Sequence, residues 1–375
     1  MTDVVEFWKC ISSKKIPIKG TKWNIVGDSW AARHTMYYIP ELSISLDIGK
    51  ESEQHPTHIF ISHSHCDHTK GLASHLLEPV GTPIVVVPKP SANNIRQLVN
   101  SYHRSTKHSN TVQVKWRVIE VSILNDNTME EPLFLSELMT IKNMVFKIEL
   151  FKCVHSIPGT GYGFIEQRLK LDDQYIGMSQ DEINTIKIQG QSVTKIIEIP
   201  HFCYLGDTTH HVFYIDKQCT ILNKNIEKYG TIIVECTFLY TRDDLKQAKK
   251  TKHMHWDNLK PYIETHPNIN FVLSHFSTRY KPREILDFFA EYGLPNVFPL
   301  VHDQEEYWLN KIIEKLKTGE LSDSFKERLI LNMCIECSPP KKYIDTGGII
   351  DTGGIIDDCG IIDDGGIIDD GGIKT

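Results

Sequence analysis

Residues 57–72 read THIFISHSHCDHTKGL, and this stretch decides the fold. Its apolar, β-branched beginning predicts a short buried strand, and its end predicts the start of a helix. Between the two lie three histidines and one aspartate within six residues: His63, His65, Asp67 and His68. Imidazole and carboxylate are ligands that zinc prefers, and so dense a string is rare by chance. The stretch therefore predicts a metal site on the loop after a strand.

The four side chains cannot all reach a single ion. On a tight loop the alternating His63 and His65 can bind one ion, while Asp67 and His68 turn towards a second ion about 3.5–4 Å away. Two metal ions at that separation are typical of hydrolases that activate one water molecule between them.

Apolar runs of strand length recur along the rest of the chain. They are WNIVG at 23, LSISLDIG at 42, PIVVVP at 83, VFKIELFKCV at 145, TIIVEC at 231 and NFVLSHF at 270. Helix-like segments such as HTKGLASHLL and DDLKQAKKTK follow several of them, so the pattern predicts a mixed α/β protein. The candidate functional residues fall at strand ends, where a rigid sheet can aim side chains into a shared cleft.

The HxHxDH loop resembles that of the metallo-β-lactamase superfamily. The resemblance implies an αββα sandwich, with two mixed β-sheets flanked by helices, and three further ligands in a fixed order. It implies that His155, in FKCVHSIPGTGYGF, is the third ligand of the first ion. Asp207, in YLGDTTH, would be the bridging carboxylate, and His275, in FVLSHFSTRY, the last ligand of the second ion. Asp47, in SLDIG, looks like the aspartate that supports the metal loop by hydrogen bonds.

A narrower resemblance is to the ribonuclease Z family, endonucleases that remove the 3′ trailer from precursor tRNA. Four passages carry it: GDSWAARHTMYYI at 27, IPGTGYGF at 157, ECTF at 235 and LSHFSTRY at 273. The resemblance implies that Glu235 and a following histidine form an acid pair beside the metals. The segment KKTKHMHWDNL at 249 supplies His253 for that role, with His255 as a close competitor.

The ribonuclease Z resemblance implies two Zn²⁺ ions per chain, although histidine and aspartate ligands also suit Mn²⁺ or Fe²⁺. The implied catalytic residues are Asp67, which accepts a proton from the attacking water, and His253, which is polarised by Glu235 and protonates the leaving 3′ oxygen. The implied metal ligands are His63, His65, Asp67, His68, His155, Asp207 and His275.

Precursor tRNA or another RNA is the implied partner. Exposed cations for its phosphates would come from Lys246, Lys249, Lys250, Lys252, Arg279 and Lys281, which equally suit a solvated helix face. Residues 165–200 depart from the family pattern, because they lack the Gly/Pro-rich tip with which the family grips tRNA and carry little excess positive charge. Short members of the family commonly work as homodimers, so a homodimer is open too.

Two other functions remain as alternatives. A related hydrolase acting on a small phosphodiester, thioester or lactone would keep the metal residues without needing a surface that binds RNA. A non-catalytic RNA-binding or interaction module on the same scaffold would not need intact ligands.

Two regions of different composition divide the chain. Residues 1–337 are expected to form the hydrolase domain. Residues 338–375 begin with SPPKK and continue as a hexapeptide repeat of the form IDDGGI, which predicts a disordered acidic tail. The whole chain carries a formal charge of −7, and its last 32 residues hold eight aspartates and one lysine, so the body is close to neutral. A polyanionic partner would need a local basic patch.

Cysteine usage and hydropathy point to a soluble intracellular protein, with both cytoplasm and nucleus open. The nine cysteines are an odd number without framework spacing, so reduced thiols are expected, and the lone CxxC of Cys334 and Cys337 is weak evidence for zinc. The sequence shows no secretion signal and no apolar run long enough for a membrane helix.

Overall fold

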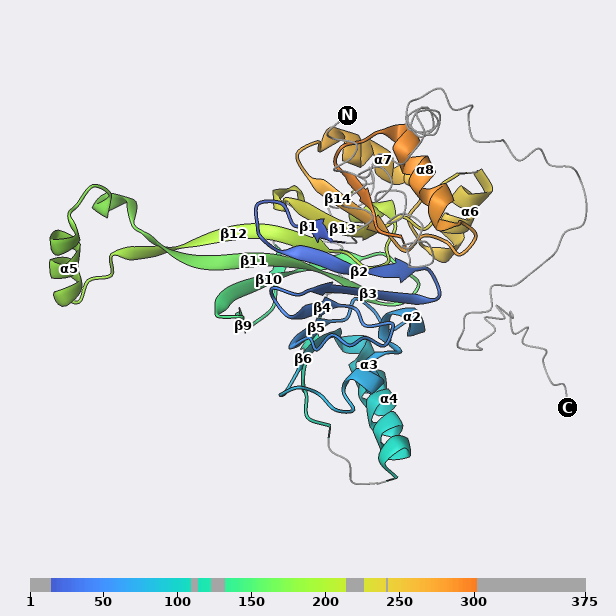
Figure 1. Cartoon of the computed structure of the whole chain (residues 1–375), viewed down its shortest axis with the longest axis horizontal. Coiled ribbons are helices and arrows are strands. Elements are labelled where there is room, and N and C mark those ends of the chain that lie inside the picture. The colour runs from blue at the N-terminus through green and yellow to red at the C-terminus, as the bar shows by residue number, and fades with distance from the viewer. Residues whose placement is uncertain (1–14, 109–113, 123–131, 214–225, 241, 302–375) are drawn as a thin grey trace, which may run out of the picture. The chain divides into compact units, whose positions relative to one another are not determined.

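The computed structural model describes residues 15–108, 114–122, 132–213, 226–240 and 242–301. Within these ranges the strands form two mixed sheets, one of seven strands and one of eight. Helices flank the pair of sheets (Figure 1). The predicted αββα sandwich is therefore confirmed.

The seven-stranded sheet has its strands in sequence order. They are β1 (Ile16–Pro17), β2 (Asn24–Trp30), β3 (His34–Ile39), β4 (Ile44–Leu46), β5 (His58–Phe60), β6 (Ile84–Pro88) and β7 (Arg117–Val121). Neighbours from β1 to β4 pair antiparallel, and neighbours from β4 to β7 pair parallel.

The eight-stranded sheet runs in the order β15-β14-β13-β12-β11-β10-β8, with β9 also paired to β10. Its members are β8 (Leu133–Phe134), β9 (Met139–Ile141), β10 (Met144–Cys153), β11 (Gly159–Leu171), β12 (Thr194–Tyr204), β13 (Thr231–Glu235), β14 (Asn270–Ser274) and β15 (Val297–Pro299). The strands from β12 to β15 are parallel, and those from β8 to β12 are antiparallel.

The described helices are short, apart from α4. They are α2 (Cys66–Thr69), α3 (Leu72–His75), α4 (Lys89–Lys107), α5 (Gln180–Ile188), α6 (Arg242–Thr251), α7 (Trp256–Thr265) and α8 (Pro282–Tyr292), with 3₁₀ turns η1 (Asp173–Tyr175), η2 (His210–Val212) and η3 (Ile226–Lys228).

Alternating side chains on the central strands build the layers. In β5 and the residue after it, Ile59 and Ile61 pack in the cluster that contains residues of α3 and α4, whereas Phe60 points into the cluster between the sheets. In β13, Ile233 faces the same inter-sheet cluster, while Ile232 faces the cluster that holds α7 and α8. Strands buried on both faces read as continuous apolar runs, which explains the HIFIS and TIIVEC patterns.

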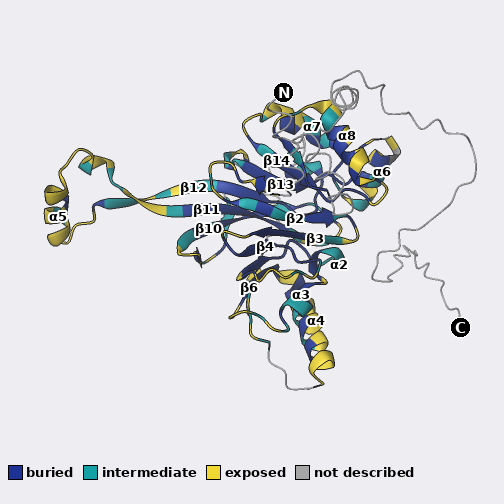
Figure 2. Ribbon diagram, viewed as in Figure 1, coloured by how far each residue is buried: buried dark blue, intermediate teal, exposed yellow. Residues whose placement is uncertain are grey.

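One feature that the sequence patterns did not predict is a two-stranded ribbon. Strands β11 and β12 run on beyond the sheet and carry α5 at their far end (Figure 1). Helix α5 starts with a capping box, in which Ser179 and Glu182 each bond the other's backbone N–H. The ribbon end is mostly exposed, whereas the strands of the sheets are buried (Figure 2).

Several predictions concern residues beyond these ranges. The boundary at 337, the acidic tail at 338–375 and the CxxC of Cys334 and Cys337 all lie outside the described residues. Of the described cysteines, Cys66, Cys153, Cys203 and Cys236 are free thiols. No helix in the described part of the chain is long and apolar enough to cross a membrane.

Candidate metal centre

The predicted metal loop leaves the sheet at the end of β5, as the sequence indicated. Asp47 holds its first residue, because the Asp47 carboxylate accepts hydrogen bonds of 2.6 Å from both the backbone N–H and the hydroxyl of Ser62. Gly49 brings the two loops together, since a Cβ at this position would lie 1.6 Å from the carbonyl oxygen of Asp67. The glycine of SLDIG is thus needed for a close backbone approach.

The first group of candidate ligands gathers His63, His65, His155 and Asp207. The Nδ1 atom of His65 lies 3.0 Å from His63 Nε2 and 3.1 Å from His155 Nε2. Asp207 Oδ2 lies 3.7 Å from the same nitrogen of His63 and 3.9 Å from that of His155. Residues from three separate segments therefore converge on one small volume.

The second group gathers Asp67, His68 and His275. The Nε2 atoms of His68 and His275 are 3.3 Å apart, and Asp67 Oδ2 lies 3.7 Å from the first and 3.3 Å from the second. Asp207 Oδ2 is 3.4 Å from both of these nitrogens as well. One oxygen of Asp207 thus stands between the two groups, as a bridging carboxylate would.

Hydrogen bonds on the outer ring nitrogens orient four of the imidazoles. His68 Nδ1 donates to Asp47 Oδ2 (2.6 Å), and His155 Nδ1 donates to the carbonyl of Lys252 (3.1 Å). In the same way Nδ1 of His63 pairs with the Ser62 hydroxyl (3.0 Å) and Nδ1 of His275 with the Thr237 hydroxyl (3.1 Å). In each ring Nε2 faces the ligand group, while Nδ1 has a hydrogen-bond partner on the outer side. Metal-binding histidines usually have such a partner on the nitrogen that does not bind the metal.

The donor set fits a divalent metal. Ligand atoms around a tetrahedral ion with bonds of 2.0–2.1 Å lie about 3.3 Å apart. The atom pairs described above are separated by 3.0–3.9 Å, close to that spacing, and all ligand atoms of a group lie within 4.8 Å of one another. Nitrogen and carboxylate donors of this kind suit zinc as well as manganese or iron.

Burial and charge divide the imidazoles into two classes. Burial, with the positive charge of His68 when it is protonated, holds the pKa of His63 well below its usual range, and burial lowers that of His155 to about 4. Burial also lowers the pKa of His68, but the carboxylates of Asp207, Asp67 and Asp47 outweigh it and raise that pKa well above the usual range. The first group therefore presents neutral nitrogens, and the carboxylates of the second group attract positive charge.

Beside the second group lies the predicted acid pair. Glu235 ends β13 and is buried, and its Oε1 accepts a 2.8 Å hydrogen bond from His253 Nδ1. Burial lowers the pKa of His253, but the Glu235 carboxylate outweighs it and raises the pKa to about 9. The ring therefore stays protonated at neutral pH.

The choice between the two nearby histidines is made by local backbone geometry. Lys252 adopts a left-handed conformation (φ 55°), and His253 after it turns towards the centre, where its ring stacks on that of His275 at 5.4 Å. His255 instead caps α7, with its Nδ1 accepting from the N–H of Asp257 (3.1 Å). The geometry thus favours His253, and its catalytic role stays a prediction.

Sequence patterns missed several residues that hold the centre. Thr237 donates to Glu235 Oε2 and accepts from His275 Nδ1, so it joins the acid pair to a candidate ligand. The N–H of Ala32, in the β2–β3 turn, donates to Asp67 Oδ2 (3.0 Å). Thr237 lies in ECTF and Ala32 lies in GDSWAARHTMYYI, two of the passages that carry the family resemblance. The resemblance therefore marked these segments, but a threonine and an alanine gave no sign of their roles.

The candidate phosphate-binding cations lie on the surface near this region. Lys246, Lys249, Lys250 and Lys252 are exposed on or just after α6. Arg279 is tied to Asp244 of α6 by an ion pair of 3.0 Å and lies over the Phe238 ring at 5.7 Å. Of the other described histidines, His55 and His75 pair with each other at a ring distance of 6.0 Å, and neither belongs to the ligand groups. His302 lies outside the described residues.

Comparison with known proteins adds sequence relatives. No family model matches the sequence. The chain is 28% identical over 280 residues to the protein named tRNase Z TRZ1 of Arabidopsis thaliana. The alignment covers 73% of this chain and 91% of that relative. It is 27% identical over 267 residues to tRNase Z TRZ2, chloroplastic, of the same plant, with 70% and 69% covered.

A third relative and a solved structure carry related names. The nuclear ribonuclease Z of Triticum aestivum is 26% identical over 189 residues, covering 49% of this chain and 97% of the relative. The crystal structure of the short form of human tRNase Z aligns with 68% of this chain and 92% of its own, at 18% identity and a TM-score of 0.43. With the ligand groups in the predicted order on an αββα sandwich, the sequence relatives support the ribonuclease Z family of metallo-β-lactamase-fold proteins for this chain.

Proposed function

We propose that this chain is a metal-dependent endoribonuclease that removes the 3′ trailer from precursor tRNA. The observation that carries the proposal is the position of Asp207, whose Oδ2 lies 3.4–3.9 Å from nitrogens of both ligand groups and 3.9 Å from His253 Nδ1. A carboxylate shared by two ligand groups suits a two-metal hydrolase, and a protonated histidine beside it suits departure of an alkoxide. The name tRNase Z, which two of the relatives carry, supports tRNA as the class of substrate.

Two Zn²⁺ ions are the cofactor that we propose. His63, His65 and His155 would hold one ion, Asp67, His68 and His275 the other, and Asp207 both. When bound, the metals would lower the pKa of the attacking water and neutralise charge on the phosphate.

Side chains of the protein would then accept the proton of the attacking water and supply a proton to the leaving oxygen. Asp67 would accept the proton of the attacking water, and the Ala32 N–H, which donates to its Oδ2, holds the carboxylate in place. His253 donates Nδ1–H to Glu235, which leaves Nε2 as the atom that can pass a proton to the departing 3′ oxygen of the ribose. Because Glu235 also accepts from Thr208 N and Met254 N, its carboxylate cannot swing away.

RNA contacts are proposed for two regions. The exposed lysines of α6 would bind backbone phosphates next to the site. The ribbon would bind a part of the tRNA far from the cut, although Arg168, Lys170, Lys187 and Lys195 are offset by a similar number of acids there. A homodimer is the oligomeric state that we propose, and analytical ultracentrifugation would test it.

The experiment is cleavage of a 3′-extended precursor tRNA by zinc-loaded protein, with the cut mapped on a gel beside Asp67→Ala. A metal-dependent cut just after the discriminator base that is lost in the variant is the expected result. Bis-p-nitrophenyl phosphate, a thioester and a lactone are run in parallel. An intact precursor, together with turnover of one of these, would overturn the tRNA assignment and leave a hydrolase with another substrate.

A further inference from the structure

Two buried tyrosines cross between the sheets directly behind the candidate ligands. Tyr37 of β3 and Tyr204 of β12 are each almost fully buried, and their rings meet edge to face at 5.7 Å. The Tyr204 hydroxyl donates to Asp47 Oδ2, and the Tyr37 hydroxyl hydrogen-bonds with the Ser274 hydroxyl. Each tyrosine thus belongs to one sheet and bonds a residue at the end of the other.

Both partners of these tyrosines control a candidate ligand. Asp47 Oδ2, which receives the Tyr204 hydroxyl, also receives Nδ1–H of His68 at 2.6 Å. Ser274 precedes His275, whose backbone lies in the left-handed region (φ 59°). The Nε2 atoms of His68 and His275 come within 3.3 Å of each other. One ring is therefore held from the first sheet and the other from the second.

We propose that Tyr204 and Tyr37 are positioning residues that fix the distance between the His68 and His275 imidazoles, and so set the metal affinity of the second ligand group. The inference rests on the proposed metal centre and adds to it two residues outside the ligand set. The two hydroxyls add directed hydrogen bonds between the sheets behind the second ligand group, and such bonds resist sliding more than apolar packing does. The neighbouring bonds from the Thr160 N–H and the Tyr162 hydroxyl instead reach the carbonyls of Ser62 and Ile61, just before His63 of the first group.

The chemistry of the buried contacts supports a strong coupling. Burial, together with the Asp47 carboxylate, raises the pKa of Tyr204 well above its usual range, so the phenol keeps its proton and donates. A hydrogen bond to an ionised carboxylate away from water is stronger than a neutral one. Asp47 also accepts from the backbone N–H and the hydroxyl of Ser62, so with the Tyr204 hydroxyl its carboxylate is held from both sheets.

The test compares Tyr204→Phe and Tyr37→Phe with Tyr162→Phe. Tyr162 is an equally buried tyrosine on the neighbouring strand β11, but its hydroxyl donates to the carbonyl of Ile61 rather than to Asp47 or Ser274. Zn²⁺ affinity is measured by competition with a chelator, and the visible spectrum of the Co²⁺-loaded protein reports the geometry of the ligands. Melting of the metal-free proteins measures the purely structural cost of each lost hydroxyl.

We expect Tyr204→Phe and Tyr37→Phe to weaken metal binding by the second ligand group up to about 10-fold, the low end of the 10- to 100-fold cost of losing a direct partner of a ligand, and to change the Co²⁺ spectrum. Tyr162→Phe should leave both unchanged even if it melts as early. Unchanged affinity and spectrum in the first two variants, or an equal change in the third, would overturn the inference alone. A wild-type protein that binds no metal would overturn the proposed function and this inference with it.

Discussion

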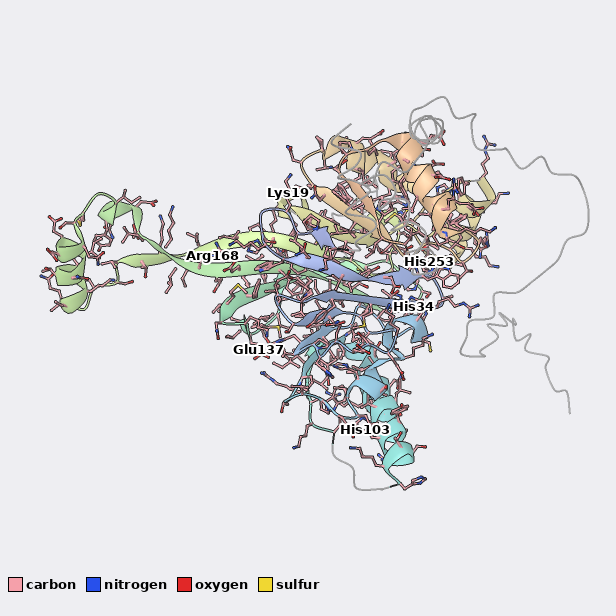
Figure 3. All side chains as sticks on the ribbon, in the orientation of Figure 1. Lys19, His34, His103, Glu137, Arg168 and His253 are labelled. Atoms are coloured by element: carbon pink, nitrogen blue, oxygen red, sulfur yellow. The ribbon has the colours of Figure 1, made fainter. Side chains whose placement is uncertain are left out.

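The two ends of the β11–β12 hairpin are stabilised in opposite ways. At the metal end, the N–H of Thr160 donates to the carbonyl of Ser62, and Tyr204 reaches Asp47, so contacts come from distant parts of the chain. At the ribbon end, Leu169 and Ile196 face each other while 73% and 62% exposed. Figure 3 labels His253 and Arg168 at these two separate places.

The comparison separates chemistry from recognition. A change at the metal end should alter catalysis on every substrate, because the proposed ligands and the proposed proton donor lie there. A change on the ribbon should affect only a substrate large enough to touch it.

Replacing Asp207 should have the largest effect. Asp207→Ala removes the one oxygen shared by both ligand groups, so we expect metal to be lost from both and hydrolysis of bis-p-nitrophenyl phosphate and of precursor tRNA to fall by about 10³-fold or more. Metal analysis and steady-state kinetics measure both outcomes. Asp173→Ala on the ribbon is the matched control and should keep full metal content. A fully metallated Asp207→Ala would contradict the bridging role.

Replacing His253 should harm turnover but spare the metal. His253→Ala removes the proposed proton donor, and we expect kcat for precursor tRNA to fall about 10²- to 10⁴-fold at unchanged metal content. His255→Asn is the control, because asparagine also caps a helix and should preserve α7. The assignment is wrong if the His255 variant loses activity and the His253 variant keeps it.

Shortening the ribbon should separate the two substrates. Leu171 pairs with Thr194, so an Asn-Gly turn joining these residues would close the hairpin without α5. We expect KM for precursor tRNA to rise about tenfold, the equivalent of about 1.4 kcal/mol of binding, with unchanged turnover of bis-p-nitrophenyl phosphate. Equal kinetics on tRNA would mean that the ribbon makes no contact with it.

Breaking either of two ion pairs should have the smallest effects, and these effects should be on stability. The two variants should differ in how their stability depends on pH. Buried Asp28 pairs with Lys50 and with His34 at 3.3 Å. Burial raises its pKa, but the neighbouring His34 ring and the Lys50 charge outweigh it and lower the pKa to about 2. This stabilisation of about 2 kcal/mol is complete above the unfolded pKa of about 3.9 and is lost as pH falls through about 2.

Urea unfolding of the metal-free proteins at neutral and acid pH tests that difference. Asp28→Asn should be destabilised at pH 7 and match the wild type below about pH 2. Asp173→Asn, which breaks the exposed pair with Lys195, should unfold like the wild type at both, because solvent screens that pair. If Asp28→Asn lowers the free energy of unfolding equally at both pH values, lost packing rather than lost charge explains the destabilisation.

Strands and ligand types were readable from the sequence. Apolar runs such as TIIVEC and PIVVVP became β13 and β6, since a strand buried on both faces needs continuous apolar residues. The ribbon was not predicted, because residues 165–200 are mostly polar and its two strands are held by their mutual register rather than by a buried face.

The loop that carries His63, His65, Asp67 and His68 after a strand could be predicted from the sequence, since strand pattern and ligand spacing are local properties. The place of Asp207 between the ligand groups, the pairing of Glu235 with His253, and the two tyrosines behind the site all depend on the tertiary fold. Tyr204 lies 157 residues from Asp47, and Tyr37 lies 237 residues from Ser274. No periodicity links residues so far apart, and they meet only because two separately formed sheets pack face to face.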